Sequence, residues 1–272
     1  MLSTYPSYLG ELVECGQRLD CRPADFGVER VMIGGEIVTE GLKERARALF
    51  GEVEFVETFG MTELLPLGGT RCEEGHLHFA PEHGMLEVID PETGMAAQRG
   101  EPGAIVATPF PPFRETTILL RYDTEDMVRT LGGELGCRLR HLPATSNLLG
   151  KRRLAVRHED GWTFPRDVLE ALEALEDVPL PARCGFWAVP GGVAVEVAVR
   201  PGGETAAVRR AIWQTLEGRG VPVREVRLVD DPRDLCRPLP LRCDLREAGF
   251  ASPGRGVVMG ELLAMGGRGD AD

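Results

Sequence analysis

The sequence predicts an α/β fold: a partial parallel α/β sheet plus a small β-barrel-like unit, followed by a small α+β carboxyl-terminal domain. Three observations support this prediction. Apolar strand patterns and amphipathic helix patterns alternate through residues 1–63, which is typical of βαβ connections and a parallel sheet. Residues 64–149 carry short apolar runs separated by turn signals. After a basic turn at 150–153, helix and hairpin patterns return.

The amino-terminal part contains the predicted parallel sheet. A helix is predicted to open at Tyr5, a strand spans 30–33, and Thr39 is suited to cap a second helix. A further strand at 53–56 is predicted to end in a turn over 58–60. Because ligands of parallel sheets lie beyond the carboxyl ends of the strands, residues 34–36 and 58–63 are predicted to face each other across one crevice.

The rest of the chain divides into a β-rich part and a compact carboxyl-terminal part. Short strands are predicted at 77–79, 85–89, 104–108 and 118–122, and a hinge at 148–153. Beyond the hinge we expect a helix from Pro165, a hairpin over 185–199, a helix over 208–216 and a strand at 223–229. The predicted domains are 1–149 (sheet 1–63, β-rich part 64–149), 150–253, and a disordered tail at 254–272.

Composition narrows the classes of function. The formal net charge of −12 argues against general binding of nucleic acid. No signal peptide is evident, and no apolar run approaches the roughly 20 residues that span a membrane. The seven cysteines are an odd number and are scattered, which favours reduced thiols and a cytoplasmic location.

The stretch Phe55 to Glu63, FVETFGMTE, combines an aromatic ring, a glycine, a hydroxyl and a carboxylate at a strand end. The ring can stack on a base, and glycine lets the backbone approach a ligand closely. The hydroxyl can donate to a phosphate, and the carboxylate can hold Mg²⁺. An ordinary loop remains an alternative interpretation, as does a plain strand-to-helix turn for Gly34-Gly35.

Four motifs, in this order, resemble the adenylate-forming superfamily, and most closely its phenylacetate-CoA ligase branch. They are GGE at 34–36, FGMTE at 59–63, DPETG at 90–94 and RYDTED at 121–126. The family carries GGE or GAE, YG.TE, DPETG and RYRTGD. The similarity runs from Tyr5 to Leu175, and the intervening lengths fit as well as the order.

The resemblance implies ATP-dependent activation of a small carboxylic acid to an acyl-adenylate, which CoA then captures as a thioester. It assigns catalytic roles to Thr62 and Glu63, and Mg²⁺ binding to Glu63. Phe59 would stack on adenine in place of tyrosine, and Asp126 would accept hydrogen bonds from the ribose hydroxyls. The implied nucleotide-binding residues are Gly34, Gly35, Glu36, Phe59, Gly60, Met61, Thr62, Asp126 and Lys151.

From the residue types alone, the charged segments around Asp126 and Lys151 also allow a second interpretation. Asp126 also fits a solvated acidic turn, and Lys151 a solvated basic turn. The acidic segment departs from RYRTGD as well, because Asp123 replaces the second arginine and Glu125 replaces the glycine. Extra negative charge beside a nucleotide opposes phosphate binding unless the side chains point away.

Further departures concern groups that the family uses for phosphate chemistry. No Ser/Thr/Gly-rich phosphate loop occurs in residues 1–30, and the only lysines are Lys43 and Lys151. Arg242 and Arg246 occur where the family places a lysine near the carboxyl terminus, and arginine is no equivalent replacement. We therefore expect a form lacking the amino-terminal half that does not complete thioester formation alone. The alternative is a non-catalytic relative that acts as a subunit or regulator.

The resemblance also implies a structural zinc, because some relatives carry one on a cysteine, a histidine and a later CxC pair. Cys72, His78 and Cys137 match part of that set. The pair reads Cys137-Arg138-Leu139, so one thiolate is missing from the four ligands that structural zinc prefers. Ordinary buried or surface thiols are the alternative.

An incomplete parallel sheet would leave an open edge and an uncovered apolar face. We therefore expect an associating chain, either with a protein partner that supplies the amino-terminal half or as a homo-oligomer.

Overall fold

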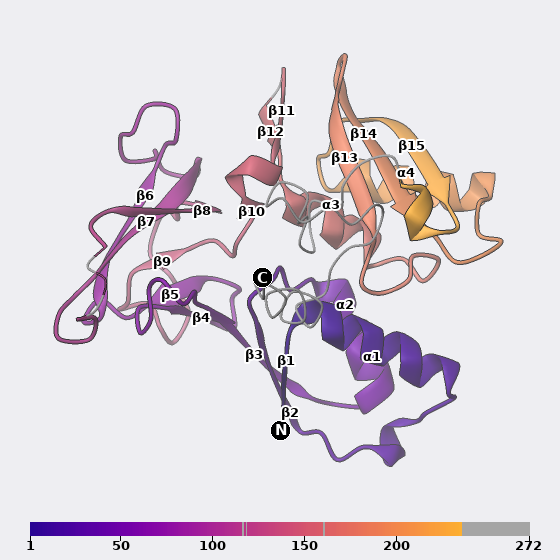
Figure 1. Ribbon diagram of the computed structural model, residues 1–272, viewed down its shortest axis with the longest axis horizontal. Coiled ribbons are helices and arrows are strands. Elements are labelled where there is room, and N and C mark those ends of the chain that lie inside the picture. The colour runs from indigo at the N-terminus through magenta and orange to yellow at the C-terminus, as the bar shows by residue number, and fades with distance from the viewer. Residues whose placement is uncertain (116, 118, 160, 236–272) are drawn as a thin grey trace, which may run out of the picture. The chain divides into compact units, whose positions relative to one another are not determined.

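The computed structural model describes residues 1–115, 117, 119–159 and 161–235 (Figure 1). The chain divides into two compact units. The first contains Met1–Tyr5, Val28–Val38 and Val53–Arg153. The second contains Pro6–Gly27, Thr39–Glu52 and the described residues from Leu154 onward. The predicted tail at 254–272 and the two arginines at 242 and 246 lie outside the described residues.

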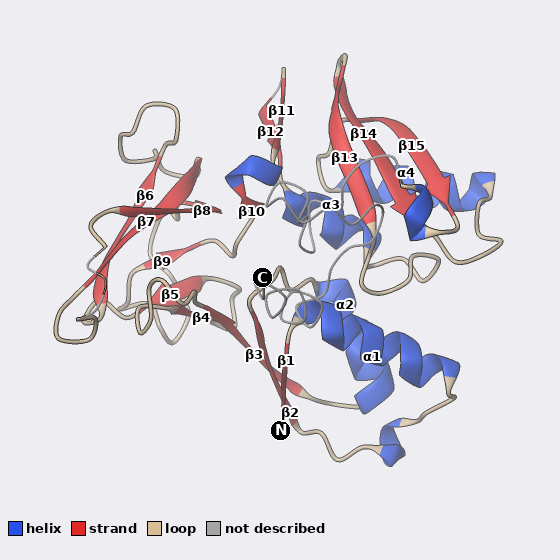
Figure 2. Ribbon diagram, in the orientation of Figure 1, coloured by secondary structure: helices blue, strands red, loops and turns tan. Residues whose placement is uncertain are grey.

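The first unit contains a six-stranded sheet in the order β1-β2-β3-β4-β5-β9 (Figure 2). Its strands are β1 (Leu2–Thr4), β2 (Arg30–Gly34), β3 (Glu54–Phe59), β4 (Gly69–Arg71), β5 (Leu77–Phe79) and β9 (Ala144–Thr145). The first three strands are parallel and the others pair antiparallel. The predicted parallel sheet is therefore confirmed, and the fold class with it.

Strand β3 is longer than the sequence pattern indicated. The predicted turn over 58–60 is wrong for its first two residues, because Thr58 and Phe59 continue the strand. They pair with Thr70 and Gly69 of β4, and this added partner strand keeps the backbone extended. Only Gly60 begins the turn.

A second sheet of the first unit is antiparallel, in the order β10-β8-β7-β6. Its strands are β6 (Gly84–Ile89), β7 (Pro102–Pro109), β8 (Tyr122–Arg129) and β10 (Gly150–Lys151). The predicted strand at 118–122 is wrong for 119–121. Arg121 has a φ of 49°, a left-handed conformation, and β8 begins at the next residue, Tyr122. The acidic residues 123–126 therefore lie within a strand.

The two sheets of the first unit share one hydrophobic core. Phe59, Leu77 and Phe79 of the first sheet pack with Ile105 and Val128 of the second. The strand patterns explain this packing, because every residue of β5 is buried and residues 103–107 of β7 are buried as well. The core thereby holds the carboxyl end of β3 against the β7–β8 hairpin.

The second unit contains a helix pair. Helix α1 (Pro6–Arg18) and helix α2 (Glu40–Phe50) meet at Gly16, where a side chain would come within 2.5 Å of Leu49. Helix α2 begins as predicted, because the Thr39 side chain accepts a hydrogen bond from the Leu42 amide.

The carboxyl-terminal part of the second unit is the predicted α+β arrangement. A three-stranded sheet consists of β13 (Cys184–Val189), β14 (Gly192–Ala198) and β15 (Val223–Val229). Helices α3 (Pro165–Leu172) and α4 (Ala206–Gly218) occur where the periodicity placed them, and β11 (Val156–His158) pairs with β12 (Gly161–Thr163). The apolar positions Val208, Ile212 and Leu216 of α4 are buried.

Carboxylates join this α+β part to the helix pair at two places. Glu14 of α1 accepts hydrogen bonds from Arg45 at 2.5 Å, from Arg200 at 2.8 and 3.0 Å, and from the Leu180 amide at 2.9 Å. At the start of α2, the Thr39 hydroxyl donates to Glu173 at 2.5 Å and the Glu40 amide donates to Glu170 at 3.2 Å. These contacts hold the second unit together through polar groups.

Within the part of the chain that the structure describes, no helix has the length and apolar character needed to cross a membrane.

Candidate nucleotide site and metal centre

The ends of the three parallel strands bring the glycine motif next to Tyr5 and Thr58. Gly34 is in register with Thr58, and a side chain at Gly34 would come within 2.3 Å of the Thr58 carbonyl oxygen. Gly35 has a φ of 82°, and a side chain there would come within 2.7 Å of the Tyr5 ring. Both glycines are therefore required by close packing and backbone conformation.

Phe59, the predicted stacking ring, is a core side chain. It is 8% exposed, and its ring meets Phe79 edge to face with centroids 5.9 Å apart. The hydrophobic core explains this burial, because Phe59 lies between the two sheets of the first unit. Its role in base stacking stays a prediction.

The loop after β3 exposes the predicted phosphate and magnesium groups. Thr62 and Glu63 are exposed, and the Arg114 guanidinium donates to the carbonyl oxygen of Thr62 at 2.9 Å and to that of Leu65 at 3.3 Å. Met61 packs against the buried Leu64, Leu67 and Ala107. The loop is therefore anchored by its backbone and by apolar contacts, and the hydroxyl and the carboxylate stay accessible to solvent.

Asp126 and Lys151 form an ion pair between β8 and β10. Lys151 Nζ lies 2.9 Å from Asp126 Oδ2 and also donates to the Thr124 carbonyl oxygen at 2.8 Å. Asp126 is 7% exposed, and burial raises the pKa of its carboxyl group, an effect that Lys151 opposes. The structure thus brings together two predicted nucleotide-binding residues that are 25 positions apart in the chain.

The two acidic departures are paired with the basic residues that follow Lys151. Arg152 lies 3.0 Å from Asp123, and Arg153 forms an ion pair with Glu125. Glu125 has a φ of 59°, the left-handed region that favours glycine, which is the residue of the related motif at this position. The added negative charges are therefore compensated within the chain.

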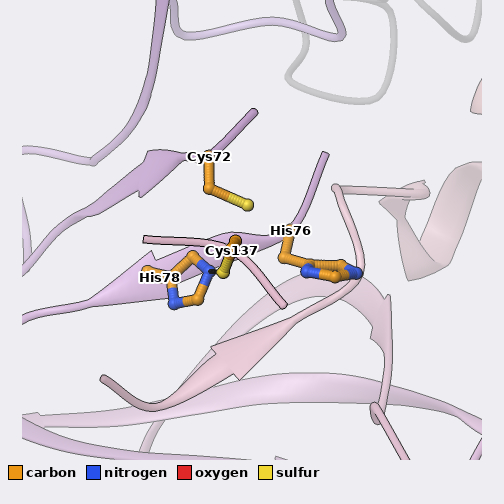
Figure 3. A group of neighbouring side chains, drawn as sticks. All are labelled: Cys72, His76, His78 and Cys137. Carbon is orange, nitrogen blue, oxygen red and sulfur yellow. Dashed lines mark hydrogen bonds between the residues drawn. The ribbon is translucent and has the colours of Figure 1, made fainter. Parts of the chain in front are cut away.

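Four side chains gather in the first unit as a compact Cys/His cluster: Cys72, His76, His78 and Cys137 (Figure 3). Their ligand atoms all lie within 4.8 Å of one another, and Cys137 Sγ is 3.2 Å from His78 Nε2. The β4–β5 hairpin supplies the first three, and its turn is closed by the Cys72 amide donating to the His76 carbonyl oxygen at 2.8 Å. Cys137 comes from a separate loop.

The surroundings of the cluster suit metal ligation. Cys72, His78 and Cys137 are buried, and burial lowers the pKa of His78 and thereby favours the neutral imidazole that a metal needs. Glu74 lies 3.7 Å from His76 Nδ1, and Glu73 accepts a hydrogen bond from the Arg138 amide, tying the two ligand loops together. Two thiols and two imidazoles, three of the four side chains buried and His76 half-buried, have the ligand types and number of a tetrahedral structural zinc site.

Sequence reasoning missed three features of these sites. Tyr5 was predicted in a helix, whereas it follows the three-residue strand β1, which is too short for a periodic signal. His76 was left out of the ligand set, and the structure brings it next to Cys72, His78 and Cys137. The Asp126–Lys151 pair has no local signal, because it depends on β8 and β10 being neighbours.

Comparison with curated proteins confirms the resemblance that the motifs indicated. The chain is 29% identical over 130 residues to the phenylacetate-coenzyme A ligase of Thermus thermophilus, a match covering 47% of this chain and 28% of that protein. The chain therefore matches only a minor part of that relative's length. No family model matches the sequence.

Solved structures share the fold across nearly the whole chain. A 2-hydroxyisobutyryl-CoA ligase in complex with R3-HIB-AMP matches 98% of this chain and 56% of its own, with a TM-score of 0.66 and 18% identity. A benzoate CoA ligase from Burkholderia xenovorans LB400 matches 96% and 50%, with a TM-score of 0.61 and 17% identity. The anthranilate CoA ligase AuaEII with anthranoyl-AMP matches 97% and 49%, with a TM-score of 0.60 and 13% identity.

Proposed function

We propose that this chain, which has the fold of part of the adenylate-forming CoA ligases, binds the adenine nucleotide in ATP-dependent activation of a small carboxylic acid. In this proposal the acid becomes an acyl-adenylate and CoA then captures the acyl group. The relatives act on phenylacetate, benzoate, anthranilate and 2-hydroxyisobutyrate, according to their names. The substrate class is therefore small carboxylic acids.

The observation that carries the proposal is the edge at which β1, β2 and β3 end. The glycine motif and the loop with Thr62 and Glu63 both follow strands at this edge, where ligands of parallel sheets bind. A glycine backbone permits close approach of a ligand, and the exposed hydroxyl and carboxylate suit a phosphate and a divalent cation. The solved relatives named above were crystallised with acyl-AMP ligands in two cases.

Each polar residue has a distinct part in this proposal. Thr62 donates its hydroxyl to a phosphate oxygen, and Glu63 holds Mg²⁺, which supplies neutralisation of phosphate charge. Asp126 accepts the ribose hydroxyls, since an ionised carboxylate is purely an acceptor. Lys151, 2.9 Å away, opposes the effect of burial, which raises the pKa of that carboxyl group.

We also propose that the chain does not complete thioester formation by itself. Its two lysines are already engaged, because Lys43 is 2% exposed and pairs with Glu40 at 2.9 Å, and Lys151 pairs with Asp126. Neither is suited to approach a reacting carboxylate. The alternative function, a non-catalytic subunit or regulator, keeps the same nucleotide site, so binding and catalysis must be measured separately.

Two assays test the proposal. In calorimetric titration, AMP should bind the parent chain, and Asp126→Ala should bind it more weakly, while Asp123→Ala serves as the neighbouring carboxylate control. Equal affinity of the parent and Asp126→Ala would remove Asp126 from the site.

In ATP–pyrophosphate exchange over a panel of aryl and aliphatic acids, the isolated chain should be inactive. Robust exchange would refute the claim that the chain is insufficient alone.

A second proposal concerns the Cys/His cluster. We infer that Cys72, His76, His78 and Cys137 hold one structural zinc ion, with His76 in place of the second thiolate of the related CxC pair. A closed set of four protein ligands leaves no position for a substrate, so the zinc would stabilise the β4–β5 hairpin against the loop that carries Cys137.

Elemental analysis tests the zinc site. Protein produced with added zinc and purified without chelators should contain about one zinc per chain, as expected for a closed four-ligand site. Cys137→Ser should lose the metal and unfold at lower temperature, whereas Cys15→Ser, a half-buried thiol of α1, should keep it. Zinc content near zero in the parent would contradict the proposal.

A further inference from the structure

A cavity of about 490 Å³ opens in the first unit, along the segment that connects β8 to β9. Its lining consists of three half-buried apolar side chains, one glycine and two charged side chains: Leu131, Leu135, Ala144, Gly133, Glu134 and Arg140. The lining includes no residue assigned to the nucleotide site or to the Cys/His cluster. A volume of this size is within the range of pockets that take a small organic molecule.

The two charged residues of the cavity, Glu134 and Arg140, are exposed and have opposite signs. In the part of the chain that the structure describes, neither side chain forms an ion pair or a hydrogen bond, with the other or with any neighbour. Arg121 and Arg152 of the same unit, by contrast, each have a carboxylate partner. A carboxylate and a guanidinium that line one cavity without pairing are suited to a ligand that carries both an ammonium and a carboxylate group.

The walls of the cavity are held by the backbone on both sides. Gly133 has a φ of 92°, and the Arg99 guanidinium lies against Gly132 and Gly133, 3.3 Å from the position that a side chain at Gly133 would take. On the other side, the Arg140 amide donates to the Cys137 carbonyl oxygen at 3.2 Å and closes a turn. Arg99 thereby adds a second positive charge near the wall, which favours an anionic group of the ligand.

We propose that this cavity binds a free aliphatic α-amino acid. The Arg140 guanidinium donates to the ligand carboxylate, Glu134 accepts from the ligand ammonium, and Leu131, Leu135 and Ala144 contact the aliphatic side chain. A plain carboxylic acid would leave Glu134 without a cation, and a plain amine would leave Arg140 without an acceptor. The inference goes beyond the proposed function, because no residue of the nucleotide site takes part in it.

Three probes of the same carbon skeleton test the requirement for both charges. They are L-leucine, 4-methylpentanoate, which lacks the ammonium group, and 3-methylbutylamine, which lacks the carboxylate. In calorimetric titration of the parent chain without nucleotide, L-leucine should bind, and each of the other two should bind about tenfold more weakly, since each loses one charge-assisted interaction. Absence of L-leucine binding, or equal affinity for all three probes, would overturn the proposal.

Variants locate the binding. Arg140→Gln and Glu134→Gln should each weaken L-leucine binding about tenfold, whereas Arg209→Gln, at an exposed arginine of α4, should bind it as the parent does. Urea unfolding confirms that the compared proteins are folded. Asp126→Ala should keep the affinity for L-leucine, and Arg140→Gln should keep the affinity for AMP, so the two sites can fail separately. L-leucine binding that Asp126→Ala weakens and Arg140→Gln does not would overturn the cavity as the site.

A measurement on the parent chain removes any dependence on the stability of the charge variants. With methyl-labelled alanine, the Ala144 signal in the NMR spectrum is the one that Ala144→Gly lacks. L-leucine should shift this signal because Ala144 lines the cavity, and AMP should not. An Ala144 signal that stays in place when L-leucine is bound would overturn the proposal, whatever the outcome of AMP binding.

Discussion

At Asp126, burial and a neighbouring cation act in opposite directions on one carboxyl group. Burial raises its pKa and Lys151 lowers it, and the raised pKa shows that burial has the larger effect. The folded chain therefore holds the Asp126 proton more tightly than the unfolded chain does. This carboxylate lowers the stability of the fold wherever it is ionised, which is the pattern expected of a group kept for binding.

The pH dependence of stability follows from this direction. In the unfolded chain the pKa of the Asp126 carboxyl group is about 3.9. The destabilising effect of ionised Asp126 should therefore grow as the pH rises from that value through the raised pKa of the folded state. Relative to the parent, Asp126→Asn should therefore gain free energy of unfolding as the pH increases. Urea unfolding at several pH values from 4 to 7 provides the measurement, and a difference that does not vary with pH would contradict the prediction.

Local residue signals explain which site residues could be found from the sequence alone. The glycine motif and FGMTE were recognisable because their residue types and order are local properties. The burial of Phe59, the partner of Asp126 and the fourth metal ligand depend on which strands become neighbours. Such long-range pairings have no counterpart in residue spacing.

Between elements, Glu14 of α1 is the main polar link from the helix pair to the carboxyl-terminal α+β part. Its carboxylate is shared by Arg45 of α2, by Arg200 after β14, and by the Leu180 amide. Gly10 of the same helix faces Pro181, because a side chain there would come within 2.9 Å of the Pro181 nitrogen. The side chains of Glu14 and Arg45 are largely buried here, whereas that of Arg200 stays 41% exposed.

Replacing Glu14 should weaken the second unit. Glu14→Gln leaves Arg45 largely buried without its charge partner, and the loss of one member of such a pair costs about 3 kcal/mol of unfolding free energy. The matched control is Glu44→Gln, an exposed glutamate of α2, which should change stability by less than about 0.5 kcal/mol. Chemical denaturation of both variants makes the comparison, and equal stability of the two would contradict the role of Glu14.

Element prediction succeeded where the signal was periodic or a cap. Helix α2 with its Thr39 cap, helix α4 and strand β15 occur as the sequence indicated. Strand β1 was missed because three residues give no measurable period, and the start of β8 was misplaced because Arg121 takes a left-handed conformation that no propensity reveals. Very short elements and residues with unusual backbone conformations therefore limit how well the elements can be predicted from the sequence.

For the molecule as a whole, one face of the parallel strands is open to solvent. Ser3, Met32 and Val56 lie in one register row; the first two are exposed and Val56 is half-buried. Within the described residues, β1 pairs only with β2. Parallel sheets are normally covered on both faces, so we propose that a partner polypeptide, or a second copy, covers this row and extends the edge at β1.

Self-association of the isolated chain should depend on this face. In sedimentation velocity, the parent should associate with increasing concentration, and Met32→Lys should associate less because a charge would be buried at the contact. Met95→Lys introduces the same charge at a residue that is 70% exposed elsewhere in the unit, and it should behave as the parent. A parent chain that stays monomeric at all concentrations would contradict self-association through this face.

Glu125 holds, in a left-handed conformation, a position where the related motif has glycine, and Arg153 pairs with it. Glutamate in place of glycine at position 125 adds backbone strain and a negative charge. This replacement is therefore tolerated best in a chain that already carries Arg153. The two positions should therefore have a shared history, in which the basic residue came first or arrived together with the acidic one. Sequences descended from the same ancestor should keep both residues or neither. Arg153 would then be a record of ancestral change in β8.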